Sequence, residues 1–216
     1  EKWNNGSIEA IKRINNGFIE RQQRKYPEAK LRLRTGVYKV EKDCDGASFA
    51  IDAANYARRQ IQDNSPETVC VYDKTMADLQ NMENEIAIGL DKAIKNKEFK
   101  IYLQPRFSLT TGKIVGAESL VRWQREDGTI LPPDSFIPVY EKNGRIIDLD
   151  FYMFEETVKL LANWKEQGIP QRLISINASA LHAQNSDTVH RYTTILEKYG
   201  VDPALIELEL TDSYSF

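Results

Sequence analysis

Residues 112–123 read GKIVGAESLVRW, and this stretch decides how the second part of the chain is interpreted. In a β-strand, side chains two residues apart point to the same face, so Glu118, Leu120 and Arg122 would share one face. The opposite face carries small and apolar residues and ends in Trp123. We expect this opposite face to pack against the core. The face of Glu118, Leu120 and Arg122 then has two explanations, a solvent-exposed sheet surface or the wall of a site.

Composition restricts the class of protein. The chain has 216 residues, of which 41% are hydrophobic and 28% are charged, as is typical of a soluble globular protein. The net charge of -3 argues against broad binding to DNA or RNA polymers, because it provides no general basic field. Apolar runs stay short of the roughly 18 residues that span a membrane. We therefore expect a cytoplasmic segment, and a full-length parent could be anchored in a membrane elsewhere.

The residues that most often bind transition metals are scarce. Cys44 and Cys70 lie far apart and have no partners at metal-ligand spacing, so we expect two ordinary thiols. His182 and His190 lie in polar surroundings, and we expect them at the surface. Any chemistry in this chain must therefore rest on carboxylates, amides and arginines.

The first 97 residues predict an α/β region followed by a long helix. Apolar residues recur at helical spacing in 7–26, and LRLRTGVYKV at 31–40 alternates as a strand does. A helix at 49–61 and a strand at 68–73 follow. Residues 73–97 form one amphipathic pattern without proline, which predicts a helix that joins two domains.

After residue 97, strands and helices alternate, which predicts a mainly parallel sheet. The first two strands are joined by the short turn at 110–112, so this pair must be antiparallel. Phe136, Ile137 and Leu149 are expected in the core. The expected strands are 99–105, 112–123, 172–177 and 205–210, and the expected helices are 136–141, 146–167 and 187–199.

Polar residues interrupt these strands late in their length. Glu118, Asn177 and Glu209 each stand where a buried strand should be apolar. In a barrel of parallel strands, groups at the carboxyl ends converge on the mouth where active sites lie. Such a barrel takes about 250 residues, and fewer than half of that number follow Glu98, so we expect the chain to end near the middle of one. Taken alone, Glu209 beside Glu207 also fits a solvated edge, and Asn177 also fits a glycosylation sequon.

Four ordered blocks resemble the EAL-domain cyclic di-GMP phosphodiesterases. They are YLQPRFSLTTGKIVGAESLVRW (102–123), LPPDSFIPVYEKNG (131–144), SINAS (175–179) and ELTD (209–212). The resemblance implies an α/β fold, a partial TIM-type (β/α) barrel of the EAL type with an antiparallel first strand. Two residues depart from the family pattern. Ser119 replaces the alanine of the name motif, which should be harmless on a packed face, and Asp212 replaces a glutamate.

Residues 1–72 resemble the C-terminal part of a GGDEF-like domain, through RTGVYKV (34–40) and the helix AIDAANYARR (50–59). This implies three parts, with 1–72 GGDEF-like, 73–97 a linker helix and 98–216 the N-terminal half of an EAL domain. The GGDEF loop would precede residue 1, so no diguanylate cyclase activity is assigned.

The resemblance also assigns roles to residues. It implies that Glu118, Asn177 and Glu209 bind Mg²⁺ or Mn²⁺, which prefer oxygen ligands, and that Glu118 is catalytic. Two cations of this kind suit phosphodiester cleavage. The residues expected to contact the nucleotide are Gln104, Leu120 and Arg122. Asp212 would stabilise the following loop. Further family residues, including paired aspartates and a lysine, would lie beyond Phe216.

The implied function is hydrolysis of cyclic di-GMP to the linear dinucleotide in bacterial signalling. Two alternatives stay open. The domain could bind cyclic di-GMP without cutting it and signal through the 73–97 helix, or it could act only as a dimerisation module. The expected partners are cyclic di-GMP and a second copy of the chain, bound through the EAL domain.

Overall fold

The computed structural model describes residues 5–41, 46–62, 65–184 and 186–211. It divides into two compact units, residues 1–82 and residues 83–215. Cys44, predicted to be an ordinary thiol, and Asp212, predicted to stabilise a loop, lie outside the described residues.

The first unit contains a short parallel strand pair packed by helices. Its elements are α1 (Asn5–Lys25), β1 (Thr35–Val37), α2 (Ala47–Arg59) and β2 (Val69–Val71). Gly36 pairs with Cys70, and α2 lies so close that a Cβ on Gly36 would meet the carbonyl oxygen of Ala54 at 1.7 Å. The strand predicted at 31–40 is therefore only three residues long, because its partner β2 offers only three residues for pairing.

The second unit is built on a five-stranded sheet in the order β3-β4-β6-β7, with β5 paired to β4. Strands β3 and β4 are antiparallel, whereas β4, β6 and β7 run parallel, as the connections predicted. The two-residue strand β5 was not predicted. The bounds are β3 (Phe99–Phe107), β4 (Ile114–Gln124), β5 (Ile130–Leu131), β6 (Leu173–Ser179) and β7 (Ile206–Thr211).

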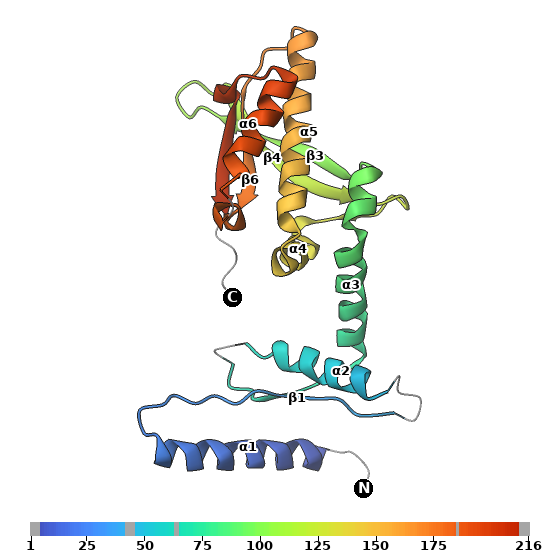
Figure 1. Cartoon of the computed structure of the whole chain (residues 1–216), viewed down its shortest axis with the longest axis vertical. Helices are drawn as coiled ribbons and strands as arrows, with labels where there is room; N and C mark the ends of the chain where they lie inside the picture. Colours follow the sequence, from blue (N-terminus) through green and yellow to red (C-terminus); the bar gives the residue numbers. More distant parts are fainter. Residues whose placement is uncertain (1–4, 42–45, 63–64, 185, 212–216) are drawn as a thin grey trace. The chain divides into compact units, whose positions relative to one another are not determined.

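Helices α4, α5 and α6 cover one face of this sheet (Figure 1). The predicted helices are confirmed to within a few residues at each end, and three short 3-10 turns were not predicted. The helices are α3 (Lys74–Lys95), α4 (Ile137–Asn143), α5 (Ile146–Glu166) and α6 (Thr188–Tyr199), and the 3-10 turns are η1 (Pro133–Ser135), η2 (Ala180–Gln184) and η3 (Pro203–Leu205).

An aromatic cluster forms the core between the first two strands and the helices. Trp123 packs against Phe99 and Phe136 with ring centroids 5.0 and 5.7 Å away, which confirms the packed face of β4. Its indole N–H donates to Glu98 Oε2 at 2.7 Å, so the polar edge of the ring is satisfied. The predicted core residues Phe136 and Leu149 are fully buried, and Ile137 is partly buried against them.

A second cluster packs the later strands. Residues of α5 and α6 meet the alternate residues Ile174 and Ile176 of β6 there. Because strand side chains alternate, Leu173, Ser175 and Asn177 of β6 face away from the helices. No helix within the described residues is long and apolar enough to cross a bilayer.

Candidate functional site

The face of the sheet that points away from the helices carries a row of polar side chains. In register, Gln104 of β3 lies opposite Glu118 of β4, and Glu118 lies opposite Ser175 of β6. Ser175 in turn lies opposite Glu207 of β7. Directly paired residues share a face, so four strands contribute one continuous polar row. The face on which Glu118 and Arg122 lie is therefore part of a polar surface that extends across several strands.

The next row along the same face contains the other two predicted ligands. Asn177 of β6 lies opposite Glu209 of β7. The side-chain amide of Asn177 donates to Glu118 Oε1 at 2.8 Å, which joins two adjacent strands. Within residues 65–184 and 186–211, no hydrogen bond reaches the second carboxylate oxygen of Glu118 or the amide oxygen of Asn177. Glu118, Asn177 and Glu209 are thus neighbours.

Close packing of the two central strands depends on Gly116. This residue is buried opposite Leu173, and a Cβ there would meet the Leu173 carbonyl oxygen at 2.5 Å. That approach is shorter than real Cβ contacts allow. Glycine therefore lets β4 and β6 approach closely at this pair. The pair lies two residues before Glu118 in β4 and two residues before Ser175 in β6, on the same face of the sheet.

Arg106 is a residue of this face that sequence reasoning missed. Its Nη1 lies 3.1 Å from Glu207 Oε2 and 3.3 Å from Glu209 Oε1. All three side chains are roughly half exposed, so water screens these ion pairs. Arg106 stands two residues after Gln104 in β3, and this spacing could have placed it on the same face. The guanidinium gives Glu209 a cationic partner within the protein.

The residues predicted to contact a nucleotide lie beside the carboxylates. Leu120 is opposite Tyr102, and Arg122 is opposite Lys100. The guanidinium carbon of Arg122 lies 5.8 Å from the centre of the Tyr102 ring, and Nη1 donates to the Val121 carbonyl at 2.8 Å. An arginine plane, an aromatic ring and an apolar side chain on one surface suit a purine and its phosphate.

Ser119 faces the opposite way from Glu118 and is buried. Its hydroxyl lies 3.1 Å from Thr157 Oγ1 of α5, and Thr157 donates to the Met153 carbonyl at 2.9 Å. Because the single hydroxyl proton of Thr157 is used for Met153, Ser119 must be the donor to Thr157. The serine is therefore accommodated in the packed face by a hydrogen bond.

The sequence predicted two surface histidines, and the prediction is confirmed for His190 and wrong for His182. His190 is exposed, but His182 is only 3% exposed. Its ring lies 5.0 Å from Phe151 and 5.6 Å from Tyr192 between centroids, so aromatic side chains enclose it. The polar residues around His182 in the sequence gave no sign of this burial. His182 forms no part of the Glu118 face.

The donor set on this face fits a hard divalent cation. Carboxylate and amide oxygens are the ligands that Mg²⁺ and Mn²⁺ prefer. In the part of the chain that the structure describes, no group of three or more His, Cys, Asp or Glu residues is placed to hold a metal ion. Glu118 and Glu209 supply two acids, and the third oxygen ligand would come from the amide of Asn177.

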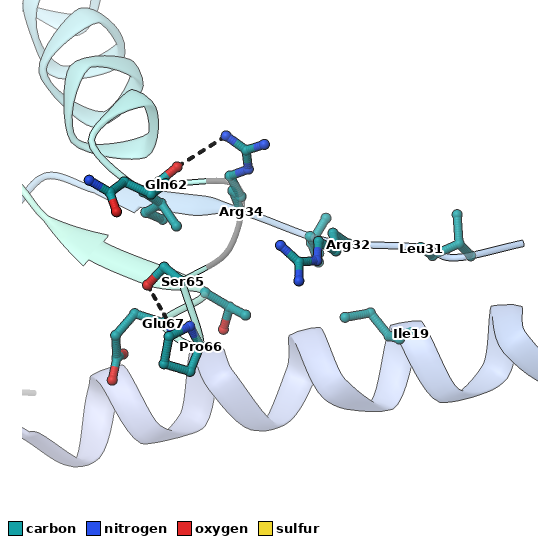
Figure 2. Close-up of a pocket in the computed structure, with 11 residues that line it drawn as sticks. Ile19, Leu31, Arg32, Arg34, Gln62, Ser65, Pro66 and Glu67 are labelled. Carbon is teal, nitrogen blue, oxygen red and sulfur yellow. Dashed lines mark hydrogen bonds between the residues drawn. The ribbon is translucent and has the colours of Figure 1, made fainter. Parts of the chain in front are cut away.

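A pocket in the first unit is separate from these residues. It lies between α1 and residues 31–34, 61–62 and 65–68, as Figure 2 shows. Arg34 is one of the lining residues, and its Nη1 donates to the Ile61 carbonyl at 3.0 Å. None of the residues predicted to bind metal or nucleotide lines this pocket. We therefore place the candidate site on the sheet face of the second unit.

Comparisons with known proteins identify relatives of this chain. The chain is 32% identical over 162 residues to the signaling protein YkoW of Bacillus subtilis, which covers 75% of this chain and 20% of that protein. It is 37% identical over 123 residues to the probable cyclic di-GMP phosphodiesterase PdeB of Escherichia coli, which covers 57% of this chain and 24% of that protein. The chain thus spans about a quarter or less of these relatives.

A solved structure supports the fold. The EAL enzyme Bd1971 in its form with bound cAMP and cyclic di-GMP is 27% identical, with a TM-score of 0.52 over 63% of this chain and 38% of that one. The predicted α/β fold, a partial TIM-type barrel with an antiparallel first strand pair, is confirmed. The EAL domain model matches residues 89–215, more than half of the chain. The chain therefore belongs to the EAL domain family.

Proposed function

We propose that this chain belongs to a cyclic di-GMP signalling protein that cleaves one phosphodiester bond of cyclic di-GMP and releases the linear dinucleotide. The observation that carries the proposal is the 2.8 Å hydrogen bond from Asn177 to Glu118, with Glu209 in register beside Asn177. It joins a carboxylate and an amide from adjacent parallel strands on one polar face. Without this arrangement, Glu118 and Glu209 would be separate surface carboxylates with no shared ligand between them.

The proposed cofactor is Mg²⁺ or Mn²⁺, held by Glu118, Asn177 and Glu209. When bound, such a cation lowers the pKa of a coordinated water and neutralises charge that develops on the phosphoryl oxygens. Each protein group contributes an oxygen ligand from a strand, and strands hold side-chain direction more firmly than loops do. The hydrogen bond between Asn177 and Glu118 sets the orientation of both groups.

Nucleotide binding is assigned to Gln104, Leu120 and Arg122. The guanidinium of Arg122 can donate to a phosphate or a guanine edge, and Leu120 provides an apolar wall for the purine. We add Tyr102 to this set, because its ring lies beside Arg122 and opposite Leu120. The names of two relatives support this ligand. PdeB is a probable cyclic di-GMP phosphodiesterase, and Bd1971 is an EAL enzyme seen with cyclic di-GMP bound.

For the rest of the chain, we propose that residues 1–72 are the C-terminal part of a GGDEF-like domain. The parallel pair β1–β2 with α2 packed on it is consistent with an α/β domain of that kind. Residues 73–97 would link it to the EAL part at 98–216. We also propose a cytoplasmic location for this segment and a homodimer formed through the EAL domain.

One observation favours a second function, binding of cyclic di-GMP without cleavage. Arg106 pairs with Glu209, a proposed metal ligand, and thereby supplies a positive charge where a cation would bind. A face held together in this way could still bind nucleotide through Arg122. A measurement of cyclic di-GMP hydrolysis distinguishes binding without cleavage from the proposed phosphodiesterase activity.

The experiment uses a protein that carries this chain within a complete EAL barrel. Replacing a residue that orients metal ligands typically costs about 10- to 100-fold, so removing a ligand with Glu118→Gln should lower hydrolysis by at least about 100-fold. Glu207→Gln is the matched control, because Glu207 lies on the same face without a proposed ligand role. Product identity and rate are read by chromatography. Hydrolysis at the wild-type rate in Glu118→Gln, or an equal loss in Glu207→Gln, would contradict the proposal.

A further inference from the structure

A buried polar cluster lies behind the sheet, outside the proposed site. Its members are Asp150 on α5 and His182 in the η2 turn, with exposed fractions of 9% and 3%. His182 Nε2 lies 3.0 Å from Asp150 Oδ2. Buried carboxylates are uncommon unless they are paired, so this placement calls for an explanation.

Asp150 also holds the main chain at the end of β6. Its Oδ2 accepts a hydrogen bond of 2.8 Å from the backbone N–H of Ser179. Ser179 is the last residue of β6 and stands two residues after Asn177. One carboxylate oxygen on a helix therefore fixes both the end of the strand and the turn that follows it.

Other contacts tie the turn to the same place. Thr188 Oγ1 donates to the His182 carbonyl at 3.1 Å, and the Tyr192 hydroxyl lies 3.3 Å from His182 Nε2. Nδ1 of His182 is buried without a hydrogen-bond partner among the described residues. Because the carboxylate of Asp150 is an acceptor, Nε2–H of His182 is the donor in this contact. The ring is thus oriented through its Nε2 side.

We propose that Asp150 is a positioning residue for Asn177, and this proposal rests on the proposed metal site. Asp150 touches neither nucleotide nor cation. It acts through Ser179 and His182, which set where β6 ends and hence the direction of the Asn177 amide toward Glu118. Groups that orient metal ligands from behind are a regular part of metal sites, and their loss weakens metal binding.

The test compares Mn²⁺ affinity by calorimetry in the protein with a complete barrel. Asp150→Ala removes the acceptor for Ser179 and His182 and should weaken Mn²⁺ binding by about 10- to 100-fold. Asp150→Asn keeps an oxygen that can accept both hydrogen bonds, so it should bind Mn²⁺ as the wild type does. If instead the negative charge of Asp150 attracted the cation, Asp150→Asn would weaken Mn²⁺ binding as much as Asp150→Ala does, and this result would contradict the positioning role.

Val158→Ala is the stability control. Val158 is fully buried on the same helix, and it packs on β6 through apolar contacts alone. It should lower the thermal unfolding midpoint and leave Mn²⁺ affinity unchanged. Mn²⁺ affinity that is unchanged in Asp150→Ala, or lost equally in Val158→Ala, would overturn the positioning role.

Glu118→Gln separates this proposal from the proposed function. If wild type and Glu118→Gln bind Mn²⁺ equally, the metal site itself is wrong; if only Glu118→Gln loses binding, Asp150 alone is misassigned. Should Asp150→Ala fail to fold, His182→Phe carries the test. It keeps an aromatic ring against Phe151 and removes the Nε2–H donor. We expect His182→Phe to weaken Mn²⁺ binding, but less than Glu118→Gln does. Unchanged Mn²⁺ affinity in His182→Phe would overturn the proposal.

Discussion

The hydrogen bond between Ser119 and Thr157 makes two single substitutions unequal. Ser119 donates to Thr157 Oγ1 at 3.1 Å, and Thr157 donates to the Met153 carbonyl at 2.9 Å. Ser119→Ala restores the alanine of the EAL motif and leaves Thr157 bonded to Met153. Because no buried group loses its only partner, the free energy of unfolding should fall by only about 0.5–1.5 kcal/mol.

Thr157→Val has a different consequence, although it also removes one hydroxyl. The Ser119 hydroxyl stays buried, at 5% exposure, and loses its acceptor. An unsatisfied buried donor costs about 1–3 kcal/mol, so Thr157→Val should destabilise the protein more than Ser119→Ala. In the double variant no hydroxyl remains unpaired. The double variant should therefore be more stable than Thr157→Val alone.

Urea unfolding of the wild type, both single variants and the double variant measures this cycle. The slope of the unfolding free energy against urea should stay constant, so that changes in midpoint report stability. Additive losses, or a larger loss for Ser119→Ala than for Thr157→Val, would refute the assigned donor direction. Hydrolysis should be unaffected in Ser119→Ala, because Ser119 faces away from Glu118.

Three further predictions concern charged groups. Arg122→Ala should weaken cyclic di-GMP binding by about 1.5–3 kcal/mol in calorimetry, the scale of a hydrogen bond to a charged group, and unchanged affinity would count against its role. Arg106→Gln removes the cation beside Glu209 and should raise Mn²⁺ affinity by about two- to fivefold, as expected for a screened ion pair; weaker binding would contradict competition. Lys198 lowers the pKa of Glu155, so their contact stabilises the fold above the unfolded-state pKa of Glu155 and is lost as pH falls through the lower folded value. Thermal unfolding should accordingly show that Glu155→Gln destabilises at pH 7 and has little effect in strong acid, and an equal effect at both would refute the linkage.

Much of the fold of the second unit could be predicted from its periodicity. The small and apolar residues opposite Glu118, ending in Trp123, indicated a packed face, and the short turn at 110–112 required an antiparallel pair. Both follow from local rules, since strand alternation and turn length depend on neighbouring residues only. The short strand β1 could not be delimited, because its length depends on pairing with distant β2.

The candidate site was only partly predictable. Glu118, Asn177 and Glu209 stood out as polar residues in apolar strands, and β-sheet register brings them together. Arg106 did not stand out, because its partners are about a hundred residues away in the sequence. The burial of His182 depends on Asp150 of α5, a contact that polar neighbours in the sequence do not signal.

The proposed metal site on the sheet face of the second unit can be tested most directly by anomalous diffraction. Crystals of a protein with the complete barrel would be soaked in Mn²⁺, and data would be collected near the manganese absorption edge. The proposed site predicts an anomalous peak bonded to oxygens of Glu118, Asn177 and Glu209, with Glu209 released from Arg106. No peak at these three residues, together with an intact pair between Arg106 and Glu209, would contradict the assignment of this face as a metal-dependent phosphodiesterase site.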